Sequence, residues 1–240
     1  MAHHLSKTQL TRNRIYVTYT ADLARFLVTH EKSFRGKDEA VGSTTSGFFL
    51  AMMERDMSMQ RELKLAVESI PEVCKYTSSE SENEIVDIWF ELVQKNIAKR
   101  VANSSMFCVM ADETRNKNNV EDVCVCVRHV DDSFVSYENL LDTIELPGLT
   151  AREISKALLW VLEETVGTDR LVAQSNDGAS VMSGSADGVQ ALVSSSVGRK
   201  IIYVHCFAHQ LHATASPCGS ESVANVKSRY MAVGYLSAAV

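Results

Sequence analysis

Asp112 and Asp177 are the residues whose positions in this sequence point most directly to chemistry. Asp112 follows the apolar run 107–111, and Asp177 follows the apolar run 171–173 within an Asn-Asp-Gly turn. Short apolar runs predict buried strands, and ligands of open α/β sheets collect at the carboxyl ends of such strands. Two carboxylates that meet there can bind divalent cations for phosphodiester chemistry. Taken alone, Asp177 is better explained as a turn or helix-capping residue.

A second group of candidate residues is His205, Cys206, His209 and His212. Sulfur and imidazole are ligands that suit Zn²⁺. A structural zinc site usually draws four ligands from two separate clusters, however, and the sequence holds one cluster. Packing of a buried Cys and His at a strand–helix junction is therefore the favoured interpretation, and we expect no structural zinc.

Glycines surround Asp177 at positions 178, 184 and 188. Their spacing matches neither a P-loop nor a dinucleotide-binding fingerprint, so tight turns explain them better than a phosphate-binding loop.

The second half of the chain predicts a mixed sheet. Strands are expected near 106–111, 122–130, 134–142, 171–175 and 201–204, and helices at 151–166 and 188–197. Short turns join the first three strands, which predicts an antiparallel meander. A helical crossover leads to the fourth strand, which should lie parallel to the first and beside it. Asp112 and Asp177 would then end neighbouring strands at one edge of the sheet.

The first half of the chain predicts helices. Residues 1–20 show no clear period and are expected to be a flexible lead-in. Residues 21–103 form a mainly helical region, whose strongest element begins at a capping-box pattern in residues 81–84. Apolar positions behind that pattern fall on one helical face: Ile85, Ile88, Trp89, Leu92, Val93, Ile97 and Val101.

Composition limits the possible functions. The chain has 45% hydrophobic and 22% charged residues, which is typical of a globular protein. We expect no membrane association, because the longest apolar runs are far shorter than the roughly 20 residues that span a bilayer. The six cysteines form no CxxC pair, which favours reduced thiols. A net charge of −6 does not favour tight nucleic-acid binding by the chain alone.

Several motifs, in order, resemble hAT-type transposases, and more narrowly the transposon-derived relatives that are often fused to MYM-type, THAP or BED zinc fingers. The motifs are Phe-Arg-Gly-Lys-Asp-Glu at 34–39, Ala-Asp-Glu-Thr at 111–114, Val-Arg-His-Val-Asp at 127–131, Asn-Asp-Gly-Ala-Ser-Val-Met-Ser-Gly at 176–184, Gly-Val-Gln-Ala-Leu at 188–192 and Tyr-Val-His-Cys-Phe-Ala-His-Gln-Leu at 203–211. The resemblance covers about residues 25–215.

The resemblance implies a ribonuclease H-like α/β fold with an active site of two Asp and one Glu. Asp112 matches the first Asp and Asp177 the second, and both would be catalytic residues and ligands of Mg²⁺ or Mn²⁺. Cys206 and His209 match a Cys-x-x-His signature. The resemblance also implies DNA as a partner and the nucleus as the location, with the cytoplasm as the alternative.

The sequence departs from the family pattern after about residue 212. The family's Glu follows a long helical insertion, whereas Glu221 is the single acidic residue after Gly188. We therefore expect a chain truncated before the catalytic Glu. It would have an incomplete ribonuclease H-like domain at 104–212 and a divergent tail at 213–240. Strand alternation should turn Glu113 away from Asp112, so that Glu113 cannot replace the missing Glu.

Two functions follow from these patterns. The first is a catalytically inactive, transposon-derived domain that acts at most as a nuclear scaffold or interaction domain and binds Mg²⁺ or Mn²⁺ weakly. The alternative is a Mg²⁺-dependent DNA transposase or nuclease core that is active only with a Glu-bearing C-terminal segment.

Overall fold

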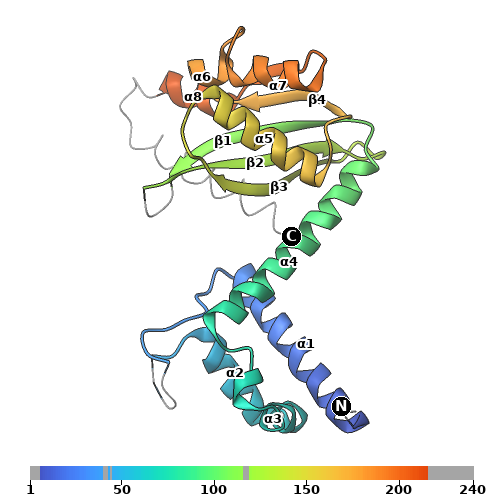
Figure 1. The fold of residues 1–240 in the computed structure, drawn as a ribbon, viewed down its shortest axis with the longest axis vertical. Coiled ribbons are helices and arrows are strands. Elements are labelled where there is room, and N and C mark those ends of the chain that lie inside the picture. The colour runs from blue at the N-terminus through green and yellow to red at the C-terminus, as the bar shows by residue number, and fades with distance from the viewer. Residues whose placement is uncertain (1–5, 40–42, 44, 116–118, 216–240) are drawn as a thin grey trace, which may run out of the picture. The chain divides into compact units, whose positions relative to one another are not determined.

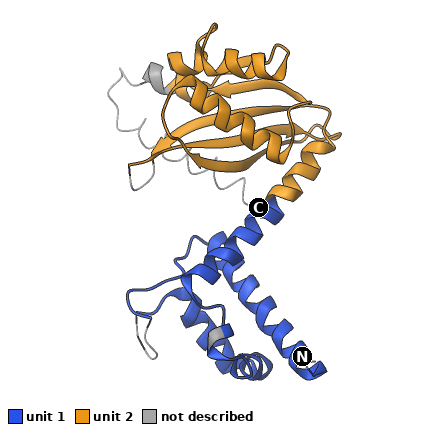
Figure 2. Cartoon of the chain, in the orientation of Figure 1, with its two compact units in different colours: residues 1–93 blue, residues 94–240 orange. Residues whose placement is uncertain are grey.

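The chain folds into two compact units, residues 1–93 and residues 94–240 (Figure 2). The computed structural model describes residues 6–39, 43, 45–115 and 119–215. The division between the units falls inside helix α4 (Ser79–Ala102), whereas the sequence pattern placed the boundary after residue 103. No helix among the described residues is long and apolar enough to cross a membrane.

Unit 1 is helical, as the sequence predicted (Figure 1). Its elements are α1 (Lys7–Thr29), α2 (Phe48–Met59), α3 (Arg61–Glu68), the 3-10 turn η1 (Glu72–Cys74) and the first part of α4. The prediction of a flexible lead-in was wrong for residues 7–20, which belong to α1. Ser6 caps this helix by accepting a hydrogen bond from Gln9 N (3.1 Å).

The early start of α1 has a physical reason that the apolar residues alone do not reveal. Its buried positions are Tyr16, Thr20, Leu23, Ala24 and Leu27. They have the three- and four-residue spacing of one helical face, but the polar Thr20 and the small Ala24 interrupt the apolar pattern. The core of unit 1 joins this face to apolar side chains of α2 and α3, among them Phe49, Met53 and Leu63.

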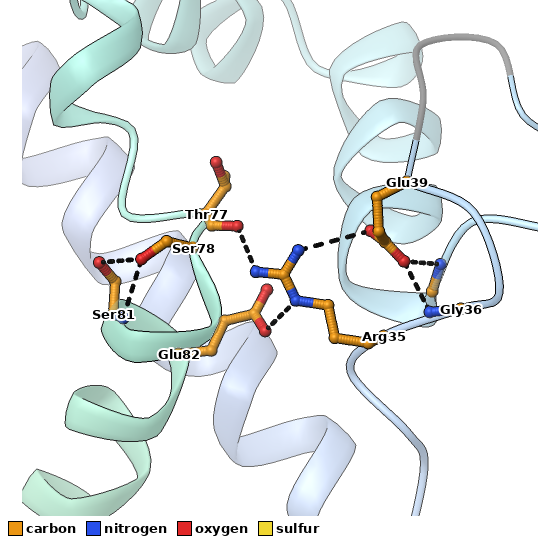
Figure 3. A network of polar contacts seen from close by, with 8 residues as sticks. Arg35, Gly36, Glu39, Thr77, Ser78, Ser81 and Glu82 are labelled. Atoms are coloured by element: carbon orange, nitrogen blue, oxygen red, sulfur yellow. Dashed lines mark hydrogen bonds and ion pairs between the residues drawn. The ribbon is translucent and has the colours of Figure 1, made fainter.

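Arg35 connects the segment after α1 to the start of α4 (Figure 3). Its Nε donates to Glu82 Oε2 (2.9 Å), and its Nη2 donates to the carbonyl oxygen of Thr77 (2.7 Å). Glu82 is nearly fully buried, and burial raises the pKa of its carboxyl group although the charge of Arg35 lowers it. On the other side of Arg35, Glu39 accepts hydrogen bonds from Gly36 N (2.6 Å) and Gly47 N (2.9 Å).

This network explains why the capping box predicted at residues 81–84 does not form as expected. The helix begins earlier, at Ser79. Ser78 Oγ accepts the hydrogen bond from Ser81 N (3.2 Å), so Ser78 rather than Ser81 caps the first turn. Glu82 is then free to turn inward and bind Arg35.

Unit 2 is built on a five-stranded mixed sheet with the strand order β3-β2-β1-β4-β5. The strands are β1 (Phe107–Arg115), β2 (Glu121–Val130), β3 (Ser136–Glu145), β4 (Leu171–Asn176) and β5 (Ile202–His205). The pairs β1–β2 and β2–β3 are antiparallel, whereas β1–β4 and β4–β5 are parallel. The predicted α/β fold, three antiparallel strands followed by helix–strand–helix–strand after a helical region, is confirmed.

Helices cover one face of this sheet (Figure 1). They are α5 (Ala151–Thr165) and α7 (Val189–Val197), with the single turn α6 (Ser180–Ser183) between β4 and α7. Thr150 and Glu153 form the predicted capping box of α5. Gly167 and Gly198 both adopt φ of 73°, a left-handed conformation that suits glycine after a helix.

The apolar residues of α4 do not all lie in one core. Ile97 and Val101 join the core of unit 2, and Ile85 packs against the core of unit 1. Ile88 and Leu92, between these two ends, are exposed. The single apolar face predicted for this helix therefore serves two cores at its two ends.

His129 of β2 is the most deeply buried titratable group near the end of α4. Its Nδ1 shares a hydrogen bond with Ser104 Oγ (2.8 Å), and its ring stacks on Tyr137 with centroids 5.4 Å apart. The guanidinium of Arg100 lies 4.3 Å from the centroid of the Tyr137 ring. Burial lowers the pKa of His129 and so does the charge of Arg100, while Asp131 opposes them.

Replacing Arg35 by Met is expected to lower the free energy of unfolding of unit 1 by about 3 kcal/mol, because it leaves the Glu82 carboxylate buried without its partner. The matched control is Arg55→Met, whose side chain is 61% exposed in its ion pair with Asp56 and should change stability by less than about 1 kcal/mol. Urea unfolding followed by Trp89 fluorescence, in a Trp160→Phe background, measures both. Equal losses in the two variants would contradict the assigned role of Arg35.

The stability of unit 2 should fall as the pH is lowered from about 7.5 to about 5.5. His129 has a lowered pKa in the folded state, so the unfolded state binds a proton first, below its ordinary pKa of about 6.5. The stabilisation is complete above that pH and is lost as the pH falls toward the folded pKa. Unfolding followed by Trp160 fluorescence, with Trp89→Phe, should show a weaker pH dependence in His129→Gln; an unchanged pH dependence would exclude His129 as the cause.

Candidate functional site

The parallel pairing of β1 with β4 stops just before the two aspartates. The two strands pair from Phe107 opposite Leu171 to Met110 opposite Ser175, with a register shift between Phe107 and Cys108. Asp112 lies two residues further along β1, and Asp177 is the first residue after β4. The structure therefore places both carboxylates beyond the same end of one strand pair, as the sequence predicted.

Asp112 does not end its strand, however, and this part of the prediction was wrong. The strand continues to Arg115, because β2 keeps pairing with it on the other side, with Cys124 opposite Asp112. The end of the β1–β4 pairing, rather than the end of the strand, leaves the backbone around Asp112 beside an open edge.

Asn176 lies at the point where β1 and β4 separate. Its Oδ1 accepts a hydrogen bond from the backbone N of Ala111 (3.2 Å), and its side chain is buried, with the residue only 1% exposed. Its own carbonyl oxygen accepts a hydrogen bond from Cys206 N (2.9 Å). The sequence reasoning treated Asn176 only as part of a turn and so missed these contacts.

Asp177 is half-buried and partly engaged by its own turn. Its Oδ1 accepts a hydrogen bond from Ala179 N (3.1 Å), so the local turn-shaping role proposed for it is real. Its carbonyl oxygen accepts a hydrogen bond from the Tyr203 hydroxyl (2.5 Å). Burial raises the pKa of Tyr203, and the negative charge of Asp177 raises it further.

Gly178 follows Asp177 and packs closely against β5. A Cβ atom at this position would overlap the imidazole ring of His205, so only glycine fits while that ring stays in place. The turn glycine and the histidine of the Cys-x-x-His region therefore belong to one packed unit.

His209 lies against the first aspartate. It belongs to α8 (Phe207–Ala215), and its Nε2 is 3.6 Å from Asp112 Oδ1, with both side chains 35% exposed. In the Cys-x-x-His signature, His209 reaches Asp112 and the backbone of Cys206 reaches Asn176, but both residues are half-buried and not buried as the packing interpretation expected. His212 also belongs to α8, but its side chain lies outside the described part of the chain.

Glu113 is a third carboxyl group, and its pKa is affected by the charges of Asp112 and Asp177. Burial raises its pKa most, followed by the negative charges of Asp177, Glu121 and Asp112. Asp112 and Glu113 are adjacent residues of β1, so strand alternation predicts that they face opposite sides of the sheet. The sequence reasoning nevertheless missed the influence of Asp177 on Glu113, because that influence depends on where the turn after β4 leads.

The carboxylate oxygens at this edge are of the type that binds a hard divalent cation, but they are too few to fill its coordination shell. Carboxylate oxygens are the ligands that Mg²⁺ prefers, and it keeps several waters when few carboxylates bind it. Within residues 6–39, 43, 45–115 and 119–215, no group of three or more His, Cys, Asp or Glu side chains is arranged to hold a metal ion. Asp112 and Asp177 would thus hold such an ion together with water, and Glu221 lies outside the described residues.

The family model described as "ZMYM1/FAM200, RNase-like domain" matches residues 1–188. The matched range includes unit 1 and both aspartates, whereas Cys206 and His209 lie beyond it.

Asp177→Asn is expected to lower the pKa of Glu113, because it removes the largest charge contribution to the raised value. Asp187→Asn removes an exposed carboxylate outside this cluster and should leave the pKa of Glu113 unchanged. The measurement is a ¹³C NMR titration of the glutamate carboxyl carbons in the presence of a chelator. If both variants left Glu113 unchanged, Asp177 would lie too far from β1 to share a site with it.

Proposed function

Because the chain belongs to the ZMYM1/FAM200, RNase-like domain family, we propose that this transposase-derived domain is of the hAT type and acts without cutting DNA. In this proposal Asp112 and Asp177 bind one Mg²⁺ or Mn²⁺ ion weakly, and the domain serves as a nuclear scaffold or interaction domain. The observation that carries the proposal is the position of the two aspartates, just beyond the end of the β1–β4 pairing.

The metal part of the proposal rests on the chemistry of the two side chains. Asp112 is about one third exposed and Asp177 is half-buried, so solvent and a cation can reach both. A divalent ion bound there would neutralise negative charge that raises the pKa of Glu113. His209, at 3.6 Å from Asp112, offers the same carboxylate a competing partner when its imidazole is protonated. The solvent exposure of both carboxylates and the competition from His209 are consistent with weak binding of the ion.

The absence of cleavage follows from the number and direction of the carboxylates. Phosphodiester cleavage by two metal ions needs ligands that hold both ions roughly 3.5–4 Å apart, so that attacking and leaving oxygens are stabilised together. Asp112 and Asp177 supply ligands for one. Strand alternation turns Glu113 to the face opposite Asp112, and burial together with the negative charge of Asp177 raises its pKa.

Partner and location are proposed from the family resemblance. DNA is the expected partner, with weak affinity because the chain carries a net charge of −6. The five cysteines that the structure describes are free thiols, which is compatible with the reducing nucleus or with the cytoplasm.

The alternative function is a Mg²⁺-dependent transposase or nuclease core that becomes active with a Glu-bearing C-terminal segment. The same observation favours it, because the first two carboxylates stand where such a core would need them. The two proposals differ in whether this 240-residue chain cuts DNA.

Mn²⁺ is expected to bind wild-type protein with a dissociation constant of about 10⁻³ M, similar to the weakest protein sites for Ca²⁺. Asp112→Asn and Asp177→Asn should each weaken binding about tenfold or more, because each removes half of the charged ligands. Asp187→Asn, which changes an exposed carboxylate, is the matched control and should bind like wild type. Electron paramagnetic resonance of free Mn²⁺ measures all four affinities, and equal affinity in every protein would contradict the proposed site.

A nicking assay on supercoiled DNA separates the two functions. With Mn²⁺ present, the wild-type chain should leave the plasmid intact. Nicking that disappears in Asp112→Asn would show that the chain is active and would overturn the non-cutting proposal in favour of the alternative.

A further inference from the structure

We infer that Asn176 is the positioning residue that sets Asp112, Asp177 and His209 around one edge of the sheet. The inference rests on the proposed function, because it concerns the same carboxylates, and it assigns to Asn176 a role that neither the family match nor the sequence motifs give it.

Three contacts of Asn176 each lead to one member of the site. Its side-chain Oδ1 holds the backbone N of Ala111, the residue before Asp112 (3.2 Å). Its carbonyl oxygen accepts from the backbone N of Cys206 (2.9 Å), at the start of the helix that carries His209. Its own peptide bond leads directly to Asp177. The bond to Ala111 depends on the Asn176 side chain, whereas the other two connections run through the backbone, so a substitution at Asn176 acts first on the segment that carries Asp112.

The side-chain hydrogen bond also explains why the strands part where they do. The register between β1 and β4 ends at Met110 opposite Ser175, and Ala111 N is then satisfied by an amide side chain instead of a backbone carbonyl. This keeps the buried donor paired, as buried backbone groups require. At the same time β4 leaves its pairing with β1, while it stays paired with β5 up to Asn176 opposite His205, and the chain then turns at Asp177.

Asn176 places a polar side chain in a buried position, where its oxygen is hydrogen-bonded and its nitrogen is not. It is 1% exposed, and its Nδ2 is a buried donor with no hydrogen-bond partner among the described residues. A buried, unsatisfied polar atom costs roughly 1–3 kcal/mol. Local departures of this kind concentrate where function, rather than stability, selects the residue.

Gln174 provides a matched comparison within the same strand. It is also a fully buried amide on the same face of β4, and its Nε2 donates to the carbonyl oxygen of Gln190 in α7 (3.1 Å). Its side-chain bond leads to a helix of the core rather than to the backbone beside an aspartate. Replacing Gln174 therefore tests the loss of a buried amide without a change at the site.

The experiment compares Asn176→Leu and the smaller change Asn176→Ala with Gln174→Leu in the full chain. The first readout needs no metal: ¹³C NMR of the aspartate carboxyl carbons and hydrogen exchange of the Ala111 amide. Both Asn176 variants should shift the signals of Asp112 and Asp177 and speed exchange at Ala111 by about tenfold or more, because the amide loses its acceptor. Gln174→Leu should leave these signals and that exchange rate as in wild type.

The second readout is the Mn²⁺ dissociation constant. Loss of a residue that orients metal ligands typically weakens binding 10- to 100-fold, so both Asn176 variants should bind Mn²⁺ at least about tenfold more weakly than Gln174→Leu. If the wild type showed no Asp177-dependent Mn²⁺ binding, the proposed function would fail, and the positioning role would still be decided by the carboxyl signals and the Ala111 amide.

Three results would overturn the inference. The first is a folded Asn176 variant with unchanged Asp112 and Asp177 signals. The second is an equal disturbance of those signals in Gln174→Leu. The third is failure of both Asn176 variants to fold while Gln174→Leu folds, because Asn176 would then be required by the fold and not specifically by the site.

Discussion

The parallel pairing of β1 with β4 is the constraint on which the candidate site depends. It joins segments that are far apart in the chain, since Phe107 lies opposite Leu171. Two further strands and helix α5 lie between them in the chain. Their apolar side chains, including Val125, Leu141 and Leu158, form the core that holds the pair together. The position of the carboxylates is therefore a property of the whole sheet and not of either motif.

The two aspartates are held in different ways, and this matters for what they can do. Asp177 is fixed by its own backbone turn, through the hydrogen bond from Ala179 N. Asp112 stands on a strand that continues past it, and the imidazole of His209, from the helix after β5, lies 3.6 Å from its carboxylate. A site with one rigid carboxylate and one that shares a partner is suited to holding an ion loosely. Tight catalytic geometry would require further ligands.

Much of this architecture could be predicted from the sequence, because it depends on periodicity and turns. Alternation and short connections predicted the meander, and the helical crossover predicted the parallel placement of β4. The boundaries of single elements were less predictable. Helix α1 begins well before its first strongly apolar stretch because Thr20 and Ala24 are buried without being markedly apolar. The start of α4 depends on Arg35, which is distant in sequence from Glu82.

The details of the site were predictable only where a motif carried them. The aspartates could be picked out from their positions after apolar runs, and the structure places both just beyond the β1–β4 pairing. The bond from Ala111 to Asn176 and the contact of His209 with Asp112 could not be predicted, because each joins segments that only the folded sheet brings together. A buried polar residue at the end of an otherwise apolar strand was the one signal that could have drawn attention to Asn176.

The contact between Gly178 and His205 shows that residues of the Asn-Asp-Gly motif are constrained for different reasons. Glycine is favoured at 178 by the space that the imidazole ring of His205 occupies, as long as that ring keeps its place. The carboxylate at 177 is not required in this way, since an asparagine there could still accept the hydrogen bond from Ala179 N. A chain that kept the glycine and exchanged the aspartate would therefore preserve the shape of the turn and give up its charge. In related chains, a glycine at this position would indicate that the turn is retained, whereas an aspartate would indicate that the charge needed for metal binding is retained.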